Sequence, residues 1–155
     1  MITNILKSLF GDKSLKDQKL YKPFVDDALS KEQAIKACTD DQLREKTQGF
    51  RALINQAIQS LETESQSLQA EAKNPNLSLD DKQVIFEKID AITKEIDEKI
   101  EGVLLEILPE AFAVVKETAF RWAHHGKLVV SATDFDKTLA SRKDGITIQG
   151  DQAIW

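Results

Sequence analysis

The residues best suited to chemistry in this chain of 155 residues are two aspartates and a threonine that follow an apolar run. The segment LVVSATDFDKTLAS (128–141) places Asp134, Asp136 and Thr138 in a D-x-D-x-T pattern. In such a pattern the first carboxylate can attack a phosphoryl group and the second can move a proton, while Mg²⁺ neutralises the phosphate. A phosphatase is therefore the first function to weigh.

This pattern resembles the first motif of the haloacid-dehalogenase phosphatases, but their remaining machinery is missing. That chemistry also needs a downstream hydroxyl, a lysine and further acidic metal ligands, and only 17 residues follow Thr138. No Rossmann-like sheet is indicated upstream. We interpret the match as chance and expect Asp134 to cap a turn or a short helix.

The other reactive side chains show no catalytic or metal-binding arrangement. His124 and His125 are adjacent, so they cannot share one helix face as an i, i+4 metal pair would; they are typical of a helix C-terminus. Cys38, the single cysteine, has no nearby base and favours a packing role. The six glycines form no phosphate loop. We predict no catalytic residue, no metal site and no cofactor in this stretch.

The N-terminal residues predict an amphipathic helix over residues 1–10, ending at Gly11. Residues 1–22 carry five lysines against Asp12 and Asp17, a net charge of +3. A basic, apolar start suits an anionic membrane or an acidic partner. The predicted contact residues are Ile2, Ile5, Leu6, Lys7, Leu9, Phe10 and Lys13. No extended basic face with interleaved aromatic residues indicates nucleic-acid binding.

Further helices are predicted downstream. Residues 14–29 predict one helix, with Pro23 inside it. Thr39 and Gln42 form a capping box that starts a helix running to about residue 73, and SLDD at 78–81 starts another. The isoleucines that follow are spaced by threes and fours, as in a coiled-coil seam. A short turn at NPN (74–76) makes the two long helices an antiparallel hairpin.

A proline and a change of composition divide the remainder. Pro109 is expected to end or kink the second long helix and to start a new helix, apolar over more than half its surface and buried on several sides. KLVVSATDF and GITIQGDQAIW then predict two strands with a short helix at 136–142. The fold class is thus mainly α: an amphipathic N-terminal helix, a long antiparallel helical hairpin, a buried helix after Pro109, and a small C-terminal β-hairpin-like segment.

Three stretches together resemble SecA, the ATPase motor of bacterial preprotein export. The first is the start, ILKSLFGDKSLKD. The second is TDDQLREKTQGFRALI (39–54), similar to the family pattern L-S-D-E-E-L-x-x-K-T-x-E-F-R. The third is LLEILPEAFAVVKETAFR (104–121), where Pro109 and the following Glu-Ala-Phe-Ala-Val-Val match the family closely. The chain departs from the family by about fifty residues between the second and third stretches, and by residues 126–155.

The resemblance implies a cytoplasmic protein that is peripheral on the inner face of the plasma membrane. The parent SecA binds ATP and Mg²⁺ and moves preproteins through the SecYEG channel. It also implies that residues 1–10 contact acidic phospholipid and the translocon, and that the helix after Pro109 packs on the remainder of the motor domain. The family's nucleotide contacts, H-F-D-V-Q and G-E-G-K-T, are absent from the chain, so this stretch alone should not hydrolyse ATP.

The predicted organisation has four parts. Residues 1–58 form an N-terminal helical segment, 59–103 an inserted hairpin, 104–125 a helix of the first motor domain, and 126–155 a strand-rich insertion in an incomplete domain. The alternative function is a stand-alone interaction module, a helical hairpin tethered to the membrane by its N-terminal helix.

Overall fold

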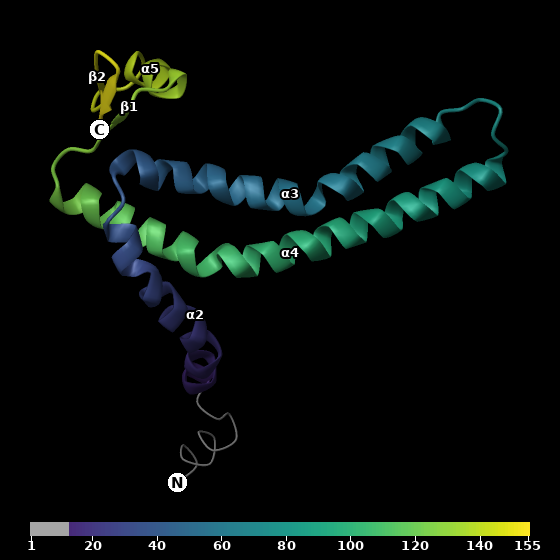
Figure 1. Cartoon of the computed structure of the whole chain (residues 1–155), viewed down its shortest axis with the longest axis horizontal. Coiled ribbons are helices and arrows are strands. Elements are labelled where there is room, and N and C mark those ends of the chain that lie inside the picture. The colour runs from purple at the N-terminus through teal and green to yellow at the C-terminus, as the bar shows by residue number, and fades with distance from the viewer. Residues whose placement is uncertain (1–12) are drawn as a thin grey trace, which may run out of the picture. The chain divides into compact units, whose positions relative to one another are not determined.

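The computed structural model describes residues 13–155 (Figure 1). The elements in this range are α2 (Lys13–Lys36), α3 (Asp40–Ala72), α4 (Leu79–His124), β1 (Val129–Ser131), α5 (Asp134–Ala140), β2 (Thr147–Gln149) and β3 (Gln152–Ile154). The prediction of a mainly helical chain with a small strand segment after the long helices is confirmed. The helix predicted over residues 1–10 lies outside the described residues.

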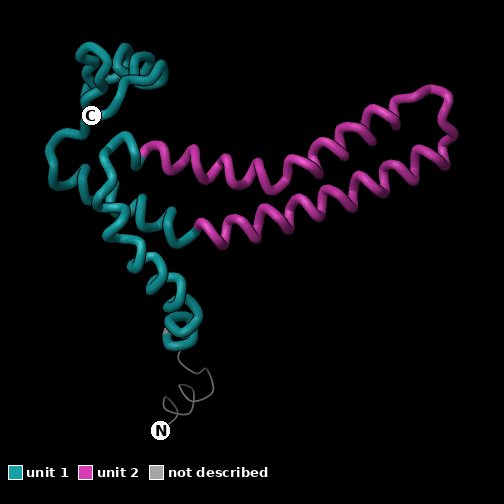
Figure 2. Tube along the Cα trace, viewed as in Figure 1, with its two compact units in different colours: residues 1–43, 108–155 teal, residues 44–107 magenta. Residues whose placement is uncertain are grey.

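The chain divides into two compact units, which are described separately (Figure 2). One unit combines the residues up to Leu43 with Leu108–Trp155, and the other is Arg44–Ile107. The second unit contains most of α3 and the first part of α4. The first unit contains α2, the start of α3, the end of α4 and the small sheet.

Capping side chains determine where the two long helices begin. The Gln42 N–H donates to Thr39 Oγ1 at 3.2 Å, and the Thr39 N–H donates to Gln42 Oε1 at 2.8 Å. The Asp81 N–H donates to Ser78 Oγ at 3.1 Å, and the Ser78 hydroxyl donates to Asp81 Oδ2 at 2.6 Å. Both predicted helix starts are confirmed, because these side-chain oxygens satisfy first-turn N–H groups that have no partner within the helix.

The unit Arg44–Ile107 is an antiparallel helical hairpin with one buried seam. The buried side chains on its α3 segment include Ile58, Leu61 and Ser65, and those on its α4 segment are Ile85 and Ile92. Their spacing of three, four or seven residues keeps one stripe of each helix turned inward. The rest of each helix in this unit is largely exposed and polar, as expected for a hairpin only two helices thick.

Of the predicted end or kink at Pro109, the end is wrong, and no separate helix starts there. α4 continues through Pro109 to His124, and α2 runs through Pro23 to Lys36, past the predicted end at residue 29. A proline inside a helix removes one N–H donor and costs about 3 kcal/mol. Helix-favouring residues lie on both sides of each proline, so propagation on either side outweighs the one lost bond.

The C-terminal segment contains three strands rather than the two predicted. They form an antiparallel sheet in the order β1-β3-β2, with Val130 paired to Ala153 at its buried centre. The second predicted strand is itself a hairpin, because Gly150 adopts a positive φ of 57° and reverses the chain between β2 and β3. The short helix predicted at 136–142 is α5, which starts two residues earlier.

The hairpin seam gives the first testable prediction. Replacing Ile85, which is 6% exposed, by alanine leaves a cavity and should lower the free energy of unfolding by about 2–4 kcal/mol. The same change at the neighbouring Val84, which is 51% exposed, should alter it by less than about 0.5 kcal/mol. Urea unfolding followed by circular dichroism at 222 nm measures both. Equal losses for the two variants would contradict the assigned seam.

Candidate functional site

The predicted membrane-contact residues fall almost entirely outside the described structure. Lys13 alone is described; it is the first residue of α2 and is exposed. The other six, Ile2, Ile5, Leu6, Lys7, Leu9 and Phe10, lie in the part that the structure does not describe. Their role stays a prediction.

The D-x-D-x-T segment serves as a helix start. Asp136 is fully buried, and its Oδ2 accepts bonds from the Thr133 N–H at 2.8 Å and the Thr133 hydroxyl at 2.7 Å. Thr133 is the N-cap of α5 and Asp136 completes its capping box. Asp134, which we expected to be the cap, is a fully exposed first-turn residue whose carboxylate lies 3.6 Å from Lys137 Nζ. The prediction for Asp134 is therefore wrong, and the cap is one residue earlier.

The histidines and the cysteine occupy helix-terminal positions. His124 is the last residue of α4, as predicted; its Nδ1 lies 2.8 Å from the Phe120 carbonyl oxygen and its ring stacks on Phe120 at 4.2 Å. The Cys38 thiol donates to the Ala34 carbonyl at 3.4 Å. Across residues 13–155 no group of three or more histidine, cysteine, aspartate or glutamate side chains is placed to hold a metal ion.

Arg121 on α4 is 7% exposed and bonds to groups on α2, α3 and its own helix. Its Nε donates to Glu117 at 2.8 Å and its Nη1 to Asp40 at 2.7 Å. Its Nη2 donates to the backbone carbonyls of Lys36 at 3.2 Å and Cys38 at 2.8 Å. One guanidinium thus satisfies carbonyls at the end of α2, pairs with the first residue of α3 and is held on α4. Such a planar set of donors is specific to arginine.

We call Arg121 together with its partners Glu117, Asp40 and the carbonyls of Lys36 and Cys38 the Arg121 joint. Its guanidinium keeps its positive charge. Burial lowers the pKa of Arg121, but the bonds to Glu117 and Asp40 outweigh burial and raise the pKa above its ordinary value. A second ion pair also joins α2 to α4, between Glu32 on α2 and Lys116 on α4. Side-chain bonds from Lys116 and then from Lys36 hold the pKa of Glu32 below its ordinary value.

Two adjacent aspartates attach the small sheet to the start of α3. β1 bonds to β3 on one side only, so alternate N–H groups of β1 point away from the sheet. The Ser131 N–H donates to Asp41 Oδ1 at 2.8 Å, and the Ser131 hydroxyl donates to Asp41 Oδ2 at 2.7 Å. The Val129 N–H lies 3.4 Å from Asp40 Oδ2. The carboxylates therefore cover an edge that would otherwise expose unpaired donors.

The face of α4 opposite Arg121 is apolar and open. Ala113, Val114 and Glu117 are buried on the Arg121 side. Phe112, Val115 and Trp122 are 60%, 65% and 64% exposed. The prediction of a helix buried on several sides is therefore met on one face only. No described helix is long and apolar enough to cross a bilayer.

The arrangement holds α2, the start of α3, the end of α4 and β1 together and leaves one apolar face of α4 open. Around Arg121 the guanidinium pairs with Asp40 on α3 and with Glu117 on its own helix, and Lys116 on α4 pairs with Glu32 on α2. Such a joint can present the open apolar face of α4 at a defined place. The described part of the chain is a mainly helical module with a small antiparallel sheet, which is the class of protein that its geometry defines.

A sequence model of the SecA DEAD-like domain matches residues 6–137, so the chain belongs to the SecA family. It is 41% identical over 152 residues to the protein translocase subunit SecA of Cytophaga hutchinsonii, covering 97% of this chain and 14% of that protein. It is 39% identical over 150 residues to that of Bacteroides fragilis, covering 97% and 13%, and 39% over 157 residues to that of Christiangramia forsetii, covering 99% and 14%. No solved structure matches.

The identification from motifs is therefore confirmed at the level of the family. The chain spans about one seventh of the length of these relatives. Relatives align along nearly all of it, including the hairpin and the small sheet, so the segments that we interpreted as insertions are shared with these relatives.

Sequence reasoning did not find Arg121, Asp41 or Ser131 as site residues. The bond from Arg121 to Asp40 joins positions 81 residues apart, and the bonds from Ser131 to Asp41 join positions 90 apart. The one available signal concerned the first bond, because Asp40 and Arg121 both lie inside the stretches that resemble the family, 39–54 and 104–121, whereas Ser131 lies outside them.

Removing the Arg121 side chain should destabilise the first unit strongly. Arg121→Ala leaves two carboxylates and two carbonyl groups without their donor, which should cost about 3–5 kcal/mol in the free energy of unfolding. Lys116→Ala removes an exposed partner of Glu32, which keeps Lys36, and should cost much less than Arg121→Ala. Chemical denaturation compares the two variants. If Arg121→Ala lowered the free energy of unfolding no more than Lys116→Ala, Arg121 would not be what holds the first unit together.

Asp41 should control the exchange of one particular amide. In Asp41→Ala the Ser131 N–H loses its acceptor, so it should exchange with solvent at least about tenfold faster, a change of roughly 1.4 kcal/mol in protection. The Ala132 N–H, which donates to the Asp151 carbonyl within the sheet, should be unaffected. Amide exchange followed by NMR resolves both. Asp134→Ala is the matched control, and unchanged Ser131 exchange in Asp41→Ala would exclude the proposed attachment.

Proposed function

We propose that this chain is the N-terminal region of a SecA-type protein translocase. Membership of the SecA family and the printed names of the relatives support this proposal. In this function the whole protein is an ATP-driven motor that moves preproteins through the SecYEG channel. The chain supplies contacts with the membrane and with the remainder of the motor domain.

The open face of α4 is the single observation that carries the packing role. Three large apolar side chains, Phe112, Val115 and Trp122, lie together on one helix face and are each more than half exposed. A contiguous exposed apolar patch is typical of a surface that another structure covers. In our proposal the motor domain that follows in the relatives covers it, while Arg121 and Glu117 hold the opposite face in place.

The N-terminal residues carry the membrane role. Residues 1–10 would lie in the interface with their apolar stripe inserted among lipids, and Lys7 and Lys13 would lie near lipid phosphates. Each lysine contributes about 1 kcal/mol near an anionic surface. The protein would then be cytoplasmic and peripheral on the inner face of the plasma membrane, in contact with SecYEG.

ATP and Mg²⁺ belong to the whole motor in this proposal. The chain contains no phosphate loop of the G-x-x-x-x-G-K-[ST] type, and the carboxylates of the D-x-D-x-T segment serve α5. The chain alone would neither bind nor hydrolyse ATP. Its carboxylates would have a structural role, because they hold α2, α3, α4 and β1 together.

Deleting residues 1–11 should abolish co-sedimentation of the chain with vesicles of anionic phospholipid, because the apolar stripe and Lys7 are lost together. Lys7→Glu with Lys13→Glu should weaken binding about 30-fold or more, from roughly 1 kcal/mol per lost lysine and added repulsion. A variant with residues 2–10 shuffled to the same composition is the matched control for amphipathicity. Sedimentation that survives the deletion would overturn the membrane role, and unchanged circular dichroism shows that the rest of the chain remains folded.

A further inference from the structure

Each of the two long helices of the hairpin contains a glycine at the same distance from the turn. On α3, Gly49 lies 23 residues before the last residue, Ala72. On α4, Gly102 lies 23 residues after the first residue, Leu79. The helices are antiparallel and both rise about 1.5 Å per residue, so the two glycines lie at one level of the hairpin, about 35 Å from the turn.

Neither the backbone conformation nor the packing requires a glycine at these two positions. Among the described residues the glycines with a positive φ are Gly126, Gly145 and Gly150, so Gly49 and Gly102 have helical conformations that other residues adopt equally well. A Cβ atom at either position would meet no packing neighbour within 4 Å. What glycine does contribute is its low helix propensity, which makes each helix easier to bend there.

The buried seam of the hairpin is interrupted at the same level. Counted from the turn, the last buried residues before the interruption are Ile58 on α3 and Ile92 on α4. The next buried residues are Leu43 on α3 and Pro109 on α4. Every residue between them on either helix is described, and none is buried. Less buried apolar area therefore holds the two helices together at this level than nearer the turn.

Pro109 adds a further weak point at the border of this level. Proline has no N–H, so the Leu105 carbonyl cannot receive the helical bond that residue 109 would otherwise donate. Proline is a common cause of bends in long helices. On α4 the level therefore combines a glycine, a missing backbone bond and a thin seam.

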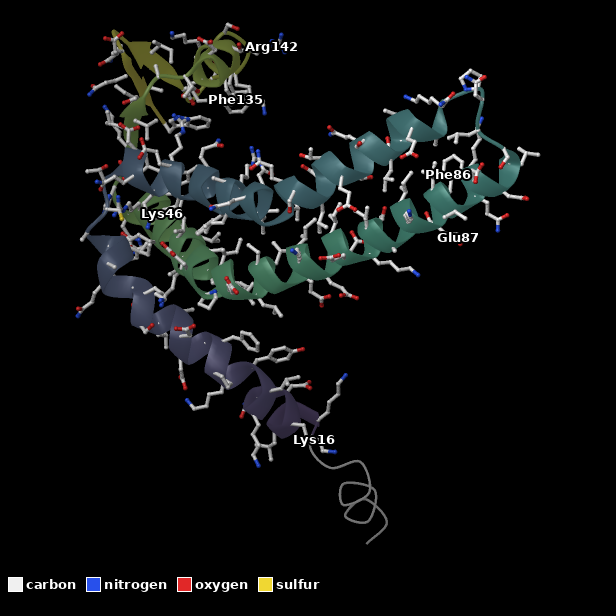
Figure 3. The ribbon with its side chains drawn as sticks, turned by 45° about the vertical axis from the view of Figure 1, so that its right-hand side comes forward. Lys16, Lys46, Phe86, Glu87, Phe135 and Arg142 are labelled. Carbon is white, nitrogen blue, oxygen red and sulfur yellow. The ribbon has the colours of Figure 1, made fainter. Side chains whose placement is uncertain are left out.

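The part of the hairpin nearer the turn, residues 58–92, has a continuous seam. Its buried side chains include Leu61 on α3 and Ile85 on α4, which are 8% and 6% exposed. We call this part the distal arm; Figure 3 labels Phe86 on it. Its packing makes it stiffer than the level that carries the glycines.

We propose that residues 44–57 of α3 and 93–108 of α4 form a hinge, about which the distal arm bends as one body. The hinge is built from helix positions with low propensity and little burial, which absorb a change of backbone angles at low cost. The arm can then change direction while its own seam and the Arg121 joint stay intact. This device goes beyond the proposed function, which assigns the hairpin no motion.

Pulsed electron paramagnetic resonance tests the hinge in the chain of 155 residues. Spin labels at Glu87→Cys and Ala119→Cys, in a background with Cys38→Ser, are 32 residues apart on α4, about 48 Å along the helix. Their distance distribution should be broad. Gly49→Ala combined with Gly102→Ala should make it at least about twofold narrower, because alanine stiffens both helices.

Ser67→Ala combined with Val84→Ala is the matched control. Both residues are exposed, both lie five residues from the turn end of their helix, and both changes raise helix propensity outside the hinge. This variant should leave the distribution unchanged. A narrow distribution before any glycine is replaced, or equal widths in the test and control variants, would overturn the proposal. Neither membrane nor motor domain enters the measurement, so the hinge and the proposed function can fail separately.

Discussion

One buried guanidinium organises the first unit. Arg121 donates to Glu117 on its own helix, to Asp40 at the start of α3, and to two carbonyls at the end of α2. Each helix end would otherwise present polar groups with no partner, and burying them unpaired would cost several kcal/mol. No buried side-chain nitrogen or oxygen in the described residues lacks a hydrogen-bond partner. These bonds join the end of α2, the start of α3 and the end of α4.

The small sheet and the open apolar face both depend on the joint. Asp40 receives Arg121 through one oxygen and faces the Val129 N–H through the other, while Asp41 binds Ser131. The same residues that close α2 against α4 therefore also hold β1. With Glu117 and Arg121 anchored on one side of α4, Phe112 and Trp122 are presented on the other. In the proposed function this face packs on the remainder of the motor domain.

Local sequence signals predicted most of the helical fold. The helix starts at Thr39 and Ser78 and the seam residues Ile85 and Ile92 follow from short-range hydrogen bonds and periodicity. The predicted helix end at Pro109 is wrong because a proline acts locally, whereas the long helical runs around it decide whether the helix continues. The Arg121 joint was beyond sequence reasoning, because nothing near Arg121 indicates a contact with a residue 81 positions away.

The accessibility of the open α4 face to a thiol reagent tests directly whether this face is covered in the longer protein. A thiol placed there by Val115→Cys, in a background with Cys38→Ser, can be labelled with maleimide both in this chain and in a longer chain that includes the following motor domain. Val115 is 65% exposed here, so labelling should be fast in the short chain and at least about tenfold slower in the long one. Val84→Cys should react equally in both. Equal rates at position 115 in the two chains would contradict the claim that this face packs on the motor domain.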